Sequence, residues 1–143
     1  MVIDKDYEAF AKRMEERFPK MFANQYGGFA VGAGWWPILE ILCANIQQHL
    51  DWKNRESEVV PQVVVEQIKE KFGGLRFYYQ GGDEQIHGMV RMAEAWADSC
   101  CEECCAPGKR RSGGWIRTLC DMHEAEHQER LRVREMKNSG FEE

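Results

Sequence analysis

Residues 101–123 read CEECCAPGKRRSGGWIRTLCDMH, and the spacing of the cysteines in this stretch decides how the C-terminal third of the chain folds. Two residues separate Cys101 from Cys104, and fifteen more lead to Cys120 and His123, which repeat the same short spacing. Two close pairs of this kind supply the four soft or borderline ligands of a tetrahedral zinc ion. The pattern therefore predicts one zinc ion bound by Cys101, Cys104, Cys120 and His123.

The second ligand pair is expected on the first turn of a helix that begins near Asp121 and runs towards Lys137. Residues at positions i and i+3 share a helix face, and the start of a helix favours the negative charge of the Cys120 thiolate. A knuckle followed by a ligand pair on a helix start is the treble-clef arrangement. Because protein side chains would fill all four positions, the site is expected to be closed and structural.

Cys100 and Cys105 flank the knuckle and keep the ligand choice open. Either could replace its neighbour, since Cys100 and Cys104 have a three-residue spacer that can also bend round a metal. The commoner two-residue spacer favours Cys101 and Cys104. In the reducing cytosol the six cysteines are better read as ligands and spare thiols than as disulfides. Cys43, expected inside a helix, is interpreted as a small core residue.

The sequence HEAEH at residues 123–127 also satisfies H-E-x-x-H, the helix motif of zinc proteases. In that interpretation His123 and His127 bind zinc and Glu124 activates a water molecule. However, Cys120 and the knuckle already account for His123, and such short matches arise by chance in Glu-rich helices. The chain also has neither a G-x-x-x-x-G-K-[ST] nor a G-x-S-x-G motif. We therefore expect no enzymatic activity.

Composition limits the classes of function. The chain has 143 residues, of which 43% are hydrophobic and 11% aromatic, as in a globular protein. Its formal net charge of -5 argues against a whole-protein attraction to nucleic acid or anionic lipid. No apolar run approaches the ~18 residues of a membrane span, and the first residues lack a signal-peptide core. We expect a cytoplasmic protein that does not bind a membrane.

Hydrophobic periodicity predicts an α+β fold upstream of the zinc segment. Three helices are expected, over residues 5–18, 37–53 and 83–98. Between the last two, a β-hairpin is expected, with strands over 59–68 and 75–80 and a turn at Gly73-Gly74. The complete fold would comprise N-terminal helices, a β-hairpin, a third helix and a C-terminal treble-clef-like zinc module. Residues 1–99 and residues 100–143 are expected to pack together as one unit.

Basic side chains gather in the zinc loop of this otherwise acidic chain. Basic residues interleaved with an aromatic ring can hold phosphates and stack a base; alternatively, the loop is merely solvated or meets an acidic protein patch. The residues concerned are Lys109, Arg110, Arg111, Trp115 and Arg117.

The hairpin and the preceding loop hold two further candidate sites. Strand alternation places Leu75 and Phe77 on one face and Arg76 on the other, where Arg76 would be either an ion-pair anchor or a recognition residue. The loop at residues 26–36 is rich in glycine and aromatic residues. It is interpreted as a structural turn, with a ligand-facing loop as the alternative.

Four segments together resemble a family of small uncharacterised phage and prophage proteins: KEKFGGLRFY at residues 69–78, Cys101-Glu102-x-Cys104, Pro107-Gly108, and Trp115-x-x-Thr118-Leu119-Cys120-x-x-His123. The similarity covers roughly residues 35–127. The family usually has glycine after the second knuckle cysteine, where this chain has Cys105.

The resemblance implies a phage accessory role inside a bacterial host cell. The leading functional hypothesis is a non-enzymatic protein that binds and modulates a host protein, such as a host defence component. One alternative is a nucleic-acid-binding regulator that uses the basic zinc loop. A weaker alternative is a small-molecule or nucleotide binder that uses the glycine- and aromatic-rich loop.

Overall fold

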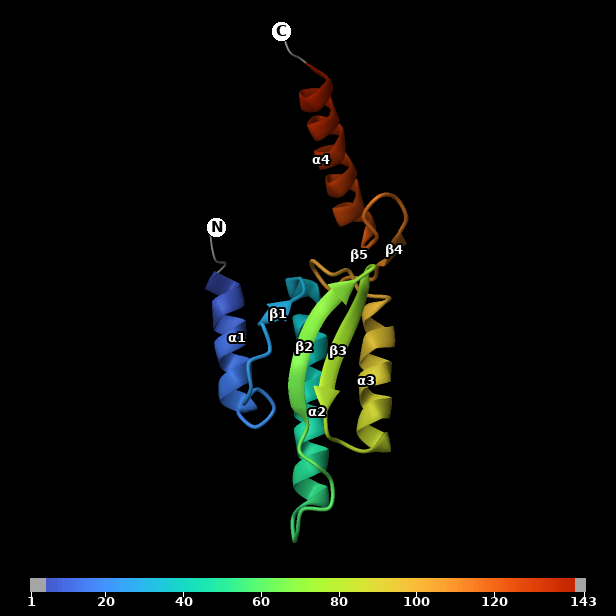
Figure 1. The fold of residues 1–143 in the computed structure, drawn as a ribbon. Coiled ribbons are helices and arrows are strands. Elements are labelled where there is room, and N and C mark those ends of the chain that lie inside the picture. The colour runs from blue at the N-terminus through green and yellow to red at the C-terminus, as the bar shows by residue number, and fades with distance from the viewer. Residues whose placement is uncertain (1–4, 141–143) are drawn as a thin grey trace.

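The computed structural model describes residues 5–140, which form the expected α+β fold (Figure 1). The helices are α1 (Lys5–Arg17), α2 (Trp36–Lys53), α3 (Glu84–Ala97) and α4 (Asp121–Gly140), with a short 3-10 helix, η1 (Ala33–Trp35), ahead of α2. One sheet has the order β1-β2-β3, from β1 (Phe29–Ala30), β2 (Val64–Lys71) and β3 (Gly74–Gln80). The second sheet pairs β4 (Lys109–Arg111) with β5 (Arg117–Leu119).

The central hairpin joins β2 to β3 through a turn of two residues. Phe72 and Gly73 both have positive φ angles, 53° and 79°, and these are the signs that a type I′ hairpin turn requires at both central positions. Gly74 pairs with Lys71 and belongs to the ladder. The turn expected at Gly73-Gly74 therefore lies one residue earlier, at Phe72-Gly73.

Helices α2 and α3 cover one face of the three-stranded sheet (Figure 1). Leu75 and Phe77 are buried on that face, Tyr79 is half-buried, and Tyr78 is exposed on the other face. The expected alternation along β3 is confirmed. The core between the layers contains Leu39, Leu42, Ile46 and Leu50 of α2 and Ile86, Val90, Ala93 and Ala97 of α3.

The glycine- and aromatic-rich loop is part of this core. Phe29 and Trp35 are buried, and the ring of Trp36 stacks on Phe10 of α1 at 4.7 Å between centroids. The Trp35 Nε1 atom donates a hydrogen bond to the carbonyl oxygen of Cys100 at 3.0 Å. A side chain at Gly34 would collide with the backbone of Cys101. The loop thus packs the main domain directly against the knuckle.

Candidate metal centre

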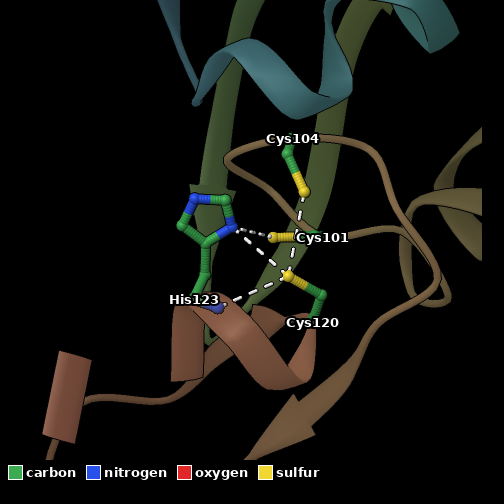
Figure 2. Close-up of side chains that lie close together, drawn as sticks. All are labelled: Cys101, Cys104, Cys120 and His123. Atoms are coloured by element: carbon green, nitrogen blue, oxygen red, sulfur yellow. Dashed lines mark hydrogen bonds between the residues drawn. The ribbon is translucent and has the colours of Figure 1, made fainter. Parts of the chain in front are cut away.

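The four predicted ligands converge at one point (Figure 2). The donor atoms of Cys101, Cys104, Cys120 and His123 all lie within 4.8 Å of one another. The Sγ atoms of Cys104 and Cys120 are 3.8 Å apart, and His123 Nδ1 lies 3.5 Å from the Cys101 sulfur and 3.3 Å from the Cys120 sulfur. Zinc–sulfur bonds of about 2.3 Å in a tetrahedron place two sulfurs about 3.8 Å apart. The cluster is a possible metal site with this geometry.

Cys101 and Cys104 are positioned by a tight turn. The backbone N–H of Cys105 donates to the Cys101 carbonyl at 2.8 Å, and the Cys101 N–H donates to the Ala106 carbonyl at 2.8 Å. Cys105 closes the turn with a φ of 71°, a left-handed conformation that glycine adopts most easily. This backbone geometry favours glycine at the position that Cys105 occupies.

Cys120 and His123 come from the start of α4. The backbone N–H of His123 points at the Cys120 sulfur at 3.4 Å, and this contact lowers the pKa of the Cys120 thiol below its ordinary value. The stabilised thiolate is the form that binds a metal. Cys120 thus directly precedes α4, where its carbonyl accepts the Glu124 N–H at 2.9 Å, and His123 lies in the first turn.

Glutamates inside the knuckle support the site, and the sequence reasoning missed them. The Nε2 atom of His123, the ring nitrogen turned away from the sulfurs, lies 3.8 Å from the Glu103 carboxylate. Arg117 bridges the pair, with Nη2 3.0 Å from Glu103 and Nε 3.1 Å from the buried Glu102. Burial raises the pKa of Glu102, which also accepts the backbone N–H of Thr118 at 3.1 Å. The sequence signal for this role was the position of Glu102 and Glu103 between the two knuckle cysteines, because carboxylates commonly orient histidines that bind a metal.

The basic residues of the zinc loop lie together around β4 and β5, but their guanidinium groups have partners. Arg110 pairs with Asp98 at 2.5 Å, and Arg111 pairs with Asp121 at 2.8 Å. Arg117 is held by the knuckle glutamates. Lys109 is exposed, and Trp115 is 71% exposed. The arginines therefore contribute chiefly to holding the module together.

Arg76 is in a different position from these arginines. Its Nη1 atom donates to the Leu75 carbonyl at 3.1 Å. Within residues 5–140 it forms no ion pair, so the anchor interpretation lacks a carboxylate partner.

His127 lies outside the four-donor cluster. It lines a groove of about 550 Å³ between α4 and the loop at residues 112–115, together with Glu124. Gln128 donates to the Oε2 atom of Glu124 at 3.0 Å, while the Oε1 atom is buried without a hydrogen-bond partner among the described residues. The two histidines of the H-E-x-x-H match thus face different surroundings.

The remaining cysteines are free thiols, and no disulfide occurs in the part of the chain that the structure describes. Cys43 is fully buried in α2, as expected, and burial raises the pKa of its thiol. Cys100 is also buried, whereas Cys105 is half-exposed. Neither belongs to the donor cluster.

None of the helices over residues 5–140 is both long enough and apolar enough to cross a membrane. Comparisons of the chain with protein-family models, curated proteins and solved structures found no match.

Proposed function

We propose that the chain is a non-enzymatic phage-type accessory protein, stabilised by one structural zinc ion, that binds and modulates a protein of the bacterial host. The donor set supports the structural role of the metal. Four protein ligands would complete a tetrahedron around a metal ion and would leave no position for a reactive water molecule.

The observation that carries the protein-binding proposal is an apolar strip on the outer side of α2 and α3. Ile41 and Trp52 of α2 are 49% and 61% exposed, and Met92 and Trp96 of α3 are 74% and 40% exposed. Met89, one turn before Met92, is half-buried and lines the same hollow as Trp52. We call these five residues the helical strip.

The spacing places the members of the strip on one face of each helix, with Asn45 and Gln48 between Ile41 and Trp52 on α2. Met89, Met92 and Trp96 are three and four residues apart and share one helix face. Ile41 and Trp52 are eleven residues apart, which is about three turns and also returns to one face. Exposed apolar side chains gathered in this way are typical of a protein-binding surface, and tryptophan is prominent among the residues that dominate such interfaces.

Site-specific photo-crosslinking in host cells tests this proposal. A photoreactive residue at Met92 should capture one discrete host protein, whereas the same residue at exposed Lys12 on α1 should not. Trp52→Asp should abolish the Met92 crosslink without changing the melting temperature, because Trp52 is largely exposed. Equal capture from Met92 and Lys12, or no capture from Met92, would overturn it.

A further inference from the structure

A second surface lies on the other face of the sheet, turned away from α2 and α3 (Figure 1). Lys69 of β2 stands opposite Arg76 of β3 in the ladder, and Lys71 follows Lys69 on the same face of β2. Tyr78 lies beside them, with its ring centroid 5.7 Å from the Nζ atom of Lys69. We call this surface, which ends at Phe72 in the turn, the sheet platform.

Its cations differ from the zinc-loop arginines because no carboxylate neutralises them. Lys69, Lys71 and Arg76 form no ion pair with a carboxylate anywhere in residues 5–140. Within a chain of net charge -5, the sheet platform is a local positive surface. Such a surface attracts an anionic ligand at short range even though the whole protein does not.

Aromatic rings alternate with these cations. Tyr78 is 40% exposed on the strand, and Phe72 is 66% exposed at the turn, where the Nζ atom of Lys71 lies 5.9 Å from its ring centroid. The exposed Trp115 lines a hollow of about 370 Å³ together with Lys71, Phe72 and Glu70, and the Glu70 carboxylate there accepts the Gly73 N–H at 2.6 Å. Exposed rings next to cations suit a ligand that combines flat bases with phosphates.

A wider hollow beside Tyr78 offers room for a base. Its volume is about 510 Å³, and its lining includes the side chains of Gln25, Gln67 and Lys69 together with Gly27 of the glycine-rich loop. Amide side chains both donate and accept hydrogen bonds, as the edges of bases require. A single carboxylate, Glu66, lines the hollow and is already held by Gln80.

The conformation of Phe72 adds an independent reason. A bulky aromatic residue is disfavoured at a φ of 53°, and asparagine or glycine is the usual choice in this turn. Backbone strain of this kind is concentrated at active sites, ligand-binding sites and switch regions. The ring of Phe72 is held outward, beside Trp115 and away from the core.

We propose that the sheet platform binds single-stranded nucleic acid. Bases would stack on Tyr78 at one end and on Phe72 and Trp115 at the other, while Lys69, Lys71 and Arg76 hold the phosphates between them. Gln67 lies opposite Tyr78, and Phe72 is five positions further along the chain. At about 3.3 Å per residue, the distance from Tyr78 to Phe72 along the strand is about 17 Å. That length suits a strand of several nucleotides rather than a single nucleotide. This surface lies across the sheet from the helical strip, so the inference does not depend on the proposed host-protein contact.

Fluorescence anisotropy of the full-length, zinc-loaded protein with labelled strands of about 12 thymidines or uridines tests the inference, since this length lies within known site sizes. Affinity should fall steeply with salt, and Lys69→Gln and Arg76→Gln should each reduce the logarithmic salt slope by about 0.7. Tyr78→Ala should weaken binding at least about fivefold. Lys12→Gln on α1 removes a comparable exposed charge and should change neither value by as much. The two strands decide between DNA and RNA.

Phe72→Asn separates binding from folding. Asparagine suits the turn, so the melting temperature should rise while affinity for the strand falls. Three results would each overturn the inference: no binding at low salt, equal displacement of the strand by polyglutamate, or unchanged affinity in both Tyr78→Ala and Phe72→Asn. Equal displacement by polyglutamate would indicate an acidic protein segment as the ligand instead.

Discussion

The Glu94 carboxylate on α3 accepts a hydrogen bond from the backbone N–H of Phe77 on β3 at 3.0 Å. Because β3 is the last strand of its sheet, this N–H has no strand partner. Exposed strand edges invite pairing with other chains, and natural proteins commonly cover them. The Glu94 side chain therefore covers the exposed edge of β3 at the middle of the strand.

Glu94→Ala is expected to lower the free energy of unfolding by about 1–2 kcal/mol, because it leaves the Phe77 N–H without its acceptor. It should also promote self-association, measured as a concentration-dependent increase in sedimentation coefficient. Glu94→Gln is the matched control, since its amide oxygen can still accept the hydrogen bond. If Glu94→Gln self-associated as strongly as Glu94→Ala, the carboxylate charge rather than the hydrogen bond would protect the edge.

The purified protein is expected to contain one zinc ion per chain, measured by elemental analysis. Cys101→Ser and Cys120→Ser should lose the ion and, with it, hydrogen-exchange protection over residues 100–123, because folding and metal binding are coupled in such sites. Protection in β2 and β3 should persist, since their core is separate from that of the module. Cys100→Ser and Cys105→Ser should keep the ion. Zinc loss in Cys100→Ser, with retention in Cys101→Ser, would contradict the ligand assignment.

Cys105→Gly is expected to stabilise the knuckle by about 1 kcal/mol, because glycine adopts the left-handed φ of 71° without strain. Cys105→Ala removes the same thiol but keeps a Cβ atom, so it should bring no such gain. Chemical denaturation of both variants with zinc bound measures the difference. Similar midpoints for the two variants would show that the thiol, and not the backbone, determines the effect.

Stability in acid is expected to depend on Asp83. A hydrogen bond from His49, at 2.8 Å, holds the pKa of Asp83 below its ordinary value of 3.8. Asp83 also caps α3 by accepting the Ile86 N–H, and this bond lowers the same pKa. A lowered pKa contributes stability above the unfolded value, and this contribution is lost as the pH falls through the folded value. Urea midpoints should therefore drop between about pH 5 and pH 3, and drop less in Asp83→Asn, which keeps a capping side chain. Parallel acid profiles for the two proteins would contradict this role.

Features that depend on nearby residues were predictable from the sequence. Each ligand pair has a two-residue spacer. Helix α4 starts at Asp121, as the expected position of Cys120 and His123 at a helix start requires. The helices followed from their hydrophobic periodicity, and the burial of Leu75 and Phe77 on one face of β3 followed from strand alternation. The start of the hairpin was wrong: β2 begins at Val64 rather than at residue 59. The Asn54 side chain accepts the N–H groups of Val59 and Val60, holding that stretch outside the ladder.

Features that depend on distant residues were not predictable. The zinc-loop arginines looked available for a ligand, but Asp98 and Glu102 neutralise them only after the chain has folded. Conversely, Lys69 was noted only as part of the KEKFGGLRFY segment, and it becomes notable because strand pairing places it opposite Arg76 and beside Tyr78. Helix α3 approaches β3 only in the tertiary structure, so the role of Glu94 was also hidden.

Helix α4 extends away from the rest of the molecule (Figure 1), and it begins directly after Cys120, with His123 in its first turn. Its 20 residues form a rod of about 30 Å. The candidate metal centre is therefore the point about which α4 would tilt. A tilt of about 10° there would move a tip about 30 Å away by about 5 Å. We therefore expect loading of the metal to influence the direction in which the far turns of α4, with exposed Val133 and Met136, are presented.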